Sequence, residues 1–154
     1  MKKYAKIITA ILIVSMLSLA LFACINPDSD KEGKMTLVLL DGDNAQEYVV
    51  DLSKLPSGNS QTGLIAVLDY LQKEGRLTYS VDGTLLTQVG DLKNNAAENT
   101  WIWLYTDVEA DINVTEWAAQ TTYKGKTYTD SGVGASQMSI KNGCTIIITY
   151  MIYN

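Results

Sequence analysis

A chain of 154 residues with a net charge of −5 and no histidine is restricted in the chemistry it can perform. An acidic protein is a poor candidate for binding nucleic acid or an anionic lipid surface. The absence of histidine excludes Ser-His-Asp and Cys-His catalysis, histidine zinc sites and histidine ligands to haem or cobalt. Catalysis by carboxylate, tyrosine or lysine side chains is not excluded by the composition.

The first 24 residues have the pattern of a secretory signal. Three lysines within the first six residues precede an apolar run without charge over Ile7–Phe22. The run ends in Leu-Phe-Ala-Cys at Cys24, which looks like a bacterial lipobox, although Phe22 is larger than the residue usual at that place. The lipobox predicts cleavage after residue 23 and a diacylglyceryl group on Cys24. The chain is then lipid-anchored at the extracytoplasmic face of the cell membrane.

Two other interpretations of this segment stay open. Residues 7–25 form a mostly apolar run near the lower limit of length for an uncleaved anchor that crosses a bilayer. Secretion with cleavage but without a lipid is also compatible with the pattern. All three interpretations place the rest of the chain outside the cytoplasm. Residues 1–23 hold three of the 12 basic residues and none of the 17 acidic ones, so the remaining chain has a net charge of −8.

Residues 24–34 are polar and include a proline and a glycine, which predicts a short tether. A single folded domain is expected over residues 35–154, a normal size for one hydrophobic core. It begins with two strand-like runs at Met35–Leu40 and Gln46–Leu52. Asp41-Gly42-Asp43-Asn44 between them has strong turn propensity, so the two runs are predicted to form a β-hairpin.

A loop over Pro56–Gln61 precedes the one convincing helix, which is predicted over Thr62–Glu74. Its apolar residues recur at helical spacing and are expected to face the core: Leu64, Val67, Leu68 and Leu71. Ser60 or Thr62 can cap the start of this helix, and Gly75 can end it. A helix of this length is not stable alone, so it is expected to lie across a sheet.

After the helix, β-leaning runs alternate with turns. The predicted strands are Leu77–Val81, Leu85–Val89, Trp101–Tyr105, a hairpin over Thr121–Tyr128 that turns at Lys124-Gly125, and finally Ser136–Ile140 and Thr145–Tyr153. Asp82-Gly83 and Asn142-Gly143 indicate further turns. This order of hairpin, helix and strands predicts an α+β fold in which one main helix packs on a mixed β-sheet.

The same order resembles the β-grasp arrangement, and three segments sharpen the resemblance. Gly63–Leu71, the aromatic strand Asn99–Thr106 and the closing segment Gly134–Gly143 are similar to motifs of a bacterial domain of unknown function. That domain is itself similar to the C-terminal domain of transcobalamin and intrinsic factor. The sequence departs from the pattern at Cys144, where the family has aspartate. The resemblance implies corrinoid binding, but it assigns no individual contact residue.

Aromatic residues form the main candidate binding surface. Trp101, Trp103 and Tyr105 alternate along one predicted strand, so their side chains are expected on the same face. If both faces of that strand are buried, the rings are core residues. Otherwise they form a platform for a flat ligand, a sugar ring or a peptide. Further rings on the following segment can border the same surface: Trp117, Tyr123 and Tyr128.

Oxygen-bearing side chains occur at alternate positions in the run Asp107, Glu109, Asp111 and Asn113. Oxygen ligands are what calcium requires, so the three carboxylates are a calcium candidate. The run lacks the glycine and the glutamate of an EF-hand loop, however. The same alternation fits a solvated edge strand with its polar side chains pointing outward. The sequence therefore predicts no metal site.

These observations predict a non-enzymatic, membrane-tethered domain that binds a ligand, for which the resemblance names a corrinoid. One alternative is a structural or adhesive module that contacts an envelope protein or a glycan through its aromatic surface. Another is a hydrolase that uses carboxylates such as Asp69. With Cys24 assigned to the lipid, Cys144 is expected to be a buried structural thiol. No bound cofactor is predicted.

Overall fold

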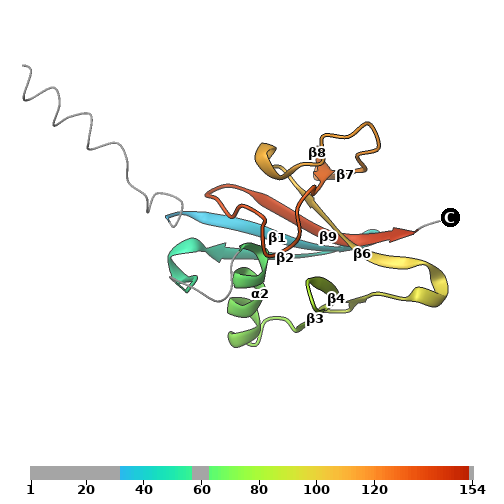
Figure 1. The fold of residues 1–154 in the computed structure, drawn as a ribbon. Coiled ribbons are helices and arrows are strands. Elements are labelled where there is room, and N and C mark those ends of the chain that lie inside the picture. Colours follow the sequence, from blue (N-terminus) through green and yellow to red (C-terminus); the bar gives the residue numbers. More distant parts are fainter. Residues whose placement is uncertain (1–31, 57–62, 153–154) are drawn as a thin grey trace, which may run out of the picture.

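The computed structural model describes residues 32–56 and 63–152. The signal segment with Cys24, most of the tether, the loop residues 57–61 and the helix caps Ser60 and Thr62 lie outside the described residues. The described part has an α+β fold, in which one helix and a small sheet lie on one face of a curled mixed sheet (Figure 1). This confirms the predicted class, with one main helix on a mixed sheet.

Six strands form the main sheet, in the spatial order β2-β1-β9-β6-β8-β7. Their bounds are β1 Lys34–Asp41, β2 Asn44–Asp51, β6 Thr100–Thr106, β7 Gln120–Tyr123, β8 Lys126–Asp130 and β9 Thr145–Ile152. β1 and β9 are parallel, and the other neighbouring pairs are antiparallel. Ile146, Ile147 and Ile148 of β9 are all fully buried, because both faces of this central strand are covered.

The β1–β2 hairpin was predicted from its turn residues and is confirmed. Its pairs extend from Lys34↔Asp51 to Asp41↔Asn44, which leaves Gly42 and Asp43 as a two-residue turn. Gly42 has a φ of +58°, a value that glycine adopts without steric cost. The ordered fold begins slightly before residue 35, since the carbonyl of Gly33 accepts the N–H of Leu52 at 2.9 Å.

Helix α2 spans Gly63–Lys73 and buries the four core residues predicted for it, Leu64, Val67, Leu68 and Leu71. They pack with apolar side chains of β1, β2 and β9 in the main core. The helix ends at the predicted glycine, because Gly75 has a φ of +66°. The N–H of Gly75 binds the carbonyl of Gln72 at 3.0 Å, and the next N–H binds that of Leu71 at 2.9 Å. This is a Schellman ending.

A second sheet of three short antiparallel strands lies beside α2, on the same face of the main sheet (Figure 1). Its strands are β3 Tyr79–Asp82, β4 Leu85–Val89 and β5 Leu92–Lys93. Leu86, Val89 and Leu92 belong to the main core. The N–H of Lys93 also donates to the hydroxyl of Tyr150 on β9 at 2.8 Å, which ties this small sheet to the large one.

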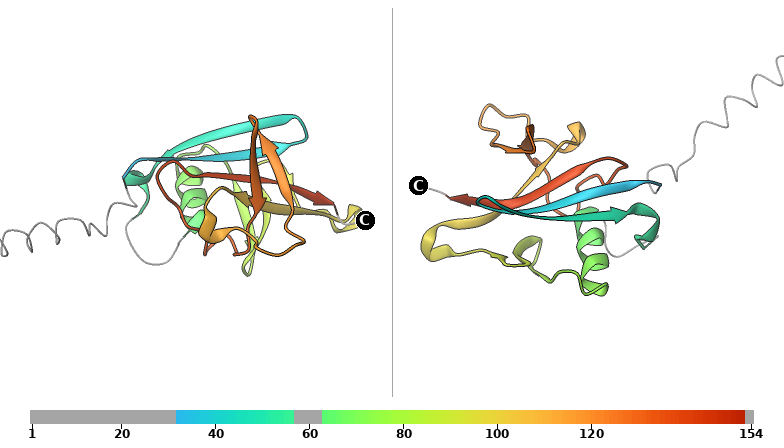
Figure 2. Two further views of the ribbon diagram at one scale, coloured as in Figure 1. Left: turned by 90° about the horizontal axis from the view of Figure 1, so that it is seen from above. Right: turned by 180° about the vertical axis from the view of Figure 1, so that it is seen from behind.

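The β7–β8 hairpin forms one edge of the main sheet and curls over the face opposite α2. It confirms the predicted hairpin with its turn at Lys124-Gly125. Seen from above, it crosses over β6, β9 and β1 toward β2 (Figure 2). The face that the helix leaves uncovered is therefore covered by this hairpin.

The predicted strand Ser136–Ile140 is wrong. The segment has no strand pairing; Met138 is buried, and the backbone N–H of Ser139 donates to the Asp111 carboxylate at 2.5 Å. A distant side chain thus satisfies a backbone group that a strand would have paired in a ladder. The strand predicted from Leu77 begins only at Tyr79. The short 3-10 helices are η2 Leu52–Lys54, η3 Ala96–Glu98 and η4 Glu109–Asp111.

Candidate functional site

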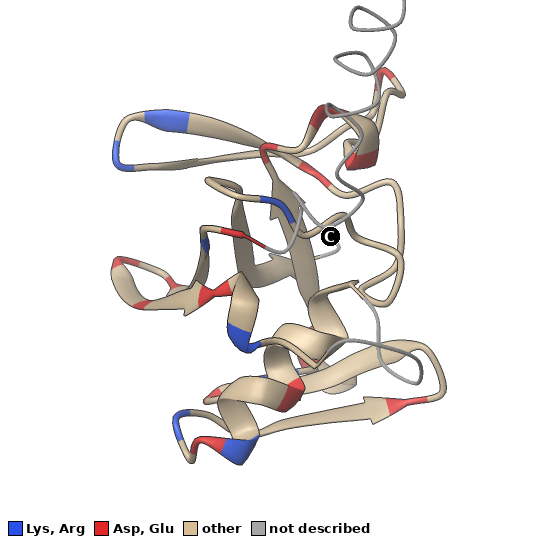
Figure 3. Ribbon diagram, turned by 90° about the vertical axis from the view of Figure 1, so that its left-hand side faces the viewer, with Lys and Arg blue, Asp and Glu red and all other residues tan. Residues whose placement is uncertain are grey.

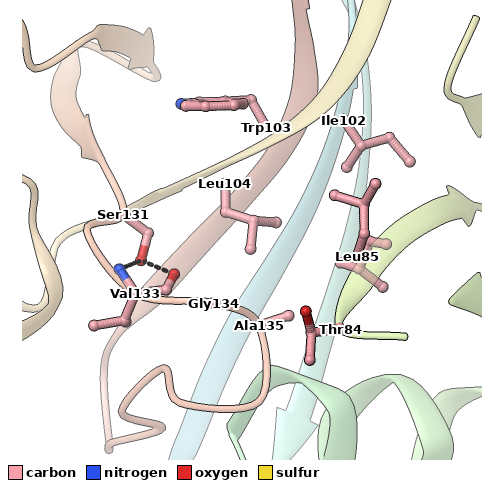
Figure 4. Close-up of a pocket in the computed structure, with 10 residues that line it drawn as sticks. Thr84, Leu85, Ile102, Trp103, Leu104, Ser131, Val133, Gly134 and Ala135 are labelled. Atoms are coloured by element: carbon pink, nitrogen blue, oxygen red, sulfur yellow. Dashed lines mark hydrogen bonds between the residues drawn. The ribbon is translucent and has the colours of Figure 1, made fainter. Parts of the chain in front are cut away.

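An apolar cavity of about 170 Å³ lies between the small sheet, the middle of β6 and the segment that follows β8. Ile102 and Leu104 point into it, whereas Trp103 points to the other side of β6 (Figure 4). This follows from the alternation of side chains along a strand. The full lining is Thr84, Leu85, Leu86, Ile102, Trp103, Leu104, Ser131, Val133, Gly134 and Ala135.

Hydrogen bonds to backbone carbonyls hold the walls of this cavity in place. The N–H of Ser131 donates to the carbonyl of Leu104 at 2.8 Å, which attaches the segment after β8 to β6. The hydroxyl of Ser131 donates to the carbonyl of Val133 at 2.9 Å and so closes a tight bend (Figure 4). The N–H of Leu64, at the start of α2, donates to the carbonyl of Ala135 at 2.8 Å. The helix therefore positions one wall.

The opposite wall is formed by the tip of the β3–β4 hairpin, where Thr84 and Leu85 follow the predicted Asp82-Gly83 turn. Leu85 is 49% exposed, a high value for a large apolar side chain, and it lies at the rim of the cavity. None of the residues that line the cavity is titratable. The arrangement can bind an apolar group, but it offers no acid or base for proton transfer.

The size of the cavity limits what can enter it. Pockets that enclose a whole small-molecule ligand usually measure about 300–1,000 Å³. A cavity of about 170 Å³ instead suits one small ring or one branched apolar side chain, with the rest of the ligand outside. Sequence patterns did not predict this site, because its walls come from three segments that are distant along the chain.

The structure brings together four of the six predicted aromatic residues, on the face of β6 away from the cavity. Tyr105 and Tyr128 are buried with Val38 and Ile147 in a small second core, against which Trp103 and Tyr123 are partly buried. The β7–β8 hairpin, which crosses this face of the sheet (Figure 2), contributes Tyr128 to the cluster and packs Tyr123 against it. Tyr105 and Tyr128 are therefore interior residues and not part of an open platform, whereas Trp103 and Tyr123 keep part of their surface exposed.

The other two aromatic candidates lie elsewhere. Trp101 is half-buried and does not belong to either apolar cluster. Trp117 lies in the segment between η4 and β7 and is 81% exposed. In the same segment Val114 is 88% exposed, so two apolar side chains project from a single loop.

The acidic run does not form the alternating strand that was considered for it, because η4 turns the chain at Glu109–Asp111. Asp107 accepts the N–H of Thr145 at 2.9 Å and pairs with the ammonium group of Lys126 at 2.6 Å. Asp111 is 5% exposed and accepts both the N–H and the hydroxyl of Ser139.

The carboxylates of Asp107 and Asp111 are thus used within the fold, whereas Glu109 is exposed. Within residues 32–56 and 63–152, no three Asp, Glu, His or Cys residues converge on a position for a metal ion. Asp and Glu instead lie at turns and strand ends on several sides of the molecule (Figure 3), and none lines the cavity.

Asp130 is a buried carboxylate that sequence patterns did not single out. It ends β8, is 3% exposed, and its Oδ2 accepts the indole N–H of Trp103 at 3.4 Å and the amide of Asn113 at 3.2 Å. Its Oδ1 is buried without a hydrogen-bond partner among the described residues. Asp130 lies two residues beyond the predicted hairpin, and a polar residue there gives no sign of burial, so no local pattern could have found it.

Groups with shifted pKa values lie away from the cavity. Burial raises the pKa of the Cys144 thiol, and this cysteine is free and buried as predicted. Burial and the hydrogen bond that its hydroxyl donates to Asp69 at 2.5 Å raise the pKa of Tyr79 to about 12. Asp69, the carboxylate considered for hydrolysis, therefore serves as an acceptor between α2 and β3.

Comparison with known proteins adds little. No family model matches the sequence, and no curated protein matches it. A solved structure from Ruminococcus gnavus, described as a "putative metal binding protein", is similar over 80% of this chain and 100% of its own, with 13% identity and a TM-score of 0.48. A likeness at this level says nothing about the ligand of this chain. No helix in the described part of the chain is long and apolar enough to span a membrane.

Proposed function

We propose that this chain is a membrane-tethered, non-catalytic binding domain on the extracytoplasmic side of the cell, and that its apolar cavity takes one apolar group of the ligand. The observation that carries the proposal is the half-open cavity bounded by Leu85, Ile102 and Leu104. Anchoring through Cys24 is supported by the charge and hydropathy pattern of residues 1–24. The lack of titratable groups in the lining supports binding over catalysis.

A β-grasp architecture is part of this proposal. It is supported by the order of the β1–β2 hairpin, helix α2 and later strands, and by the parallel pairing of the first and last strands, β1 and β9, in the middle of the sheet. The resemblance to the transcobalamin C-terminal domain names a corrinoid as the ligand. Because a corrinoid is much larger than the cavity, it would lie on the surface and insert only one apolar substituent.

The rim residue Leu85 offers a direct test. Leu85→Asp places a charge at the cavity mouth, and the residue is exposed enough that the fold should tolerate it. Val81→Asp is the matched control, because Val81 is similarly exposed at 47% on β3 but does not line the cavity. We expect Leu85→Asp to weaken binding by about tenfold or more, and Val81→Asp to leave it unchanged.

Two probes separate the cavity from the corrinoid. Binding of cobinamide and cobalamin to the purified full chain is followed by the shift of the corrin absorbance. Binding of benzene, which fits apolar cavities of this order of size, is followed by the rise in melting temperature. Benzene binding without any absorbance shift at a saturating corrinoid concentration would exclude a corrinoid as the ligand. It would still support the cavity as a site for an apolar group. Failure of both probes would contradict the proposed function.

A second candidate function is an adhesive module, favoured by the exposure of Trp117 and Val114 on one loop. Trp117→Ala is expected to abolish retention of the protein on envelope fractions or glycans, with stability changed by less than about 0.5 kcal/mol. Trp103→Ala should lower the free energy of unfolding by about 2 kcal/mol, because Trp103 packs on the buried cluster of Tyr105 and Tyr128. Unchanged retention by Trp117→Ala would contradict the adhesive role.

A further inference from the structure

The β7–β8 hairpin, residues 120–130, is attached to the main sheet over a very short length. We call this hairpin the strap. It pairs with β6 only through Tyr105↔Asp130 and Thr106↔Thr129. By contrast, β6 pairs with β9 along its whole length, from Thr100↔Ile152 to Thr106↔Ile146. The ladder that joins the strap to the sheet therefore contributes few backbone hydrogen bonds.

The strap is nevertheless well formed within itself. Its two strands pair from Gln120↔Thr129 to Tyr123↔Lys126. The two turn residues, Lys124 and Gly125, have φ values of +49° and +76°. Positive φ at both central positions is the geometry of the two-residue turns that match the twist of a hairpin. Such a unit can keep its own pairing while it moves relative to the sheet.

Two carboxylates fasten the turn end of the strap, Glu47 on β2 and Asp107 after β6. Glu47 Oε1 accepts the hydroxyl of Tyr123 at 2.6 Å and pairs with the ammonium group of Lys124 at 2.6 Å. Both partners lower the pKa of Glu47. Ion pairs between exposed side chains contribute little to stability, so this contact can open at small cost.

Beneath the strap lies the small second core, which is separate from the main core under α2. In the part of the chain that the structure describes, the buried members of this core are Val38, Tyr105, Tyr128 and Ile147. At the base of the strap, Asp130 Oδ1 is buried and accepts no hydrogen bond from any residue that the structure describes. A buried carboxylate oxygen without a partner favours any opening that lets water reach it. The short ladder to β6 holds the base of the strap in place. Lys126, which follows the turn, pairs with Asp107 nearer the tip.

We propose that the strap is a local opening unit, latched near its tip at Glu47 and Asp107 and pivoting at its base. Its release exposes Trp103, Tyr105 and Tyr128, while β1, β2, β6, β9 and α2 stay folded. Segments with few apolar contacts and short ladders open with free energies well below that of global unfolding. The face beneath the strap is thus open or closed according to the state of the latch. The strap and the cavity lie on opposite faces of β6.

Amide hydrogen exchange of the full chain tests the strap. In the wild type, amides of residues 120–130 should exchange faster than those of β9, and their rates should depend less on denaturant, because local opening exposes little surface. Glu47→Ala should raise exchange in the strap by about threefold to tenfold, since it removes an ion pair and a charged hydrogen bond. Exchange in β9 should not change.

The control is Glu109→Ala, which removes another exposed carboxylate, for which no pairing to the strap is observed. It should leave exchange in the strap unchanged. Two results would overturn the proposal. One is exchange of the strap and β9 at the same rate and with the same denaturant dependence, which would mean that the strap opens only on global unfolding. The other is a strap whose exchange does not respond to Glu47→Ala.

Discussion

Gly63→Ala is expected to lower the free energy of unfolding by about 3 kcal/mol. Gly63 begins α2 with a φ of +59°, a left-handed conformation that costs other residues about 1–2 kcal/mol. A Cβ atom at this position would also lie 2.7 Å from the carbonyl oxygen of Ala135 and 2.8 Å from that of Ser136. Backbone atoms cannot rotate away as a side chain can, so the start of the helix or the cavity wall has to shift.

Gly75→Ala is the matched control for this prediction. Gly75 has a similar φ of +66°, but a Cβ atom there would meet nothing within 4 Å. It should therefore cost only the conformational part, about 1 kcal/mol. Urea unfolding of both variants measures the difference. Equal losses of unfolding free energy would show that the close approach of α2 to the segment after β8 does not affect stability. The contact between the start of α2 and Ala135 would then not hold the cavity wall.

Asp111→Ala is expected to cost about 2–3 kcal/mol, because it removes the acceptor of two hydrogen bonds from Ser139. Asp111 is buried, so the N–H of Ser139 would be left without a partner in the interior. Glu109→Ala, two residues earlier in the same acidic run, should change stability by less than about 0.5 kcal/mol, since Glu109 is exposed. Thermal or urea unfolding compares the two variants.

The same pair of variants separates a structural role from a calcium site. A bound ion stabilises the folded state according to its concentration and dissociation constant. If the carboxylates are used within the fold, adding calcium to the wild type should leave its melting temperature unchanged. A calcium-dependent rise that both Glu109→Ala and Asp111→Ala abolish would instead establish the acidic run as a metal site.

Elements specified by neighbouring residues were predicted correctly from the sequence. The β1–β2 hairpin follows from four turn residues between two apolar runs, and α2 follows from its helical spacing and from Gly75. The alternation of side chains predicted along β6 is also confirmed, since Ile102 and Leu104 lie on the face opposite Trp103 and Tyr105. Each of these signals acts within a few residues of the chain, where local propensity and side-chain periodicity operate.

Predictions failed where a contact with a residue distant in sequence changed the secondary structure of a segment. Ser136–Ile140 has strand-like composition, but Asp111 binds the N–H of Ser139 across 28 positions of sequence. The acidic run alternates like a strand, but η4 turns it so that Asp111 faces inward. The contact between Asp111 and Ser139 leaves no pattern in the sequence of either segment.

The sequence by itself predicts an exported, acidic α+β domain with one helix and no histidine. Composition and periodicity can be read before the chain folds, which is why these properties need no tertiary structure. The cavity, the strap and the buried state of Asp130 arise only on folding. The cavity needs residues 84–86, 102–104 and 131–135 to meet, and the strap needs Tyr123 and Lys124 to reach Glu47 across the sheet. Packing between segments far apart in sequence creates these features, so they have no local signature.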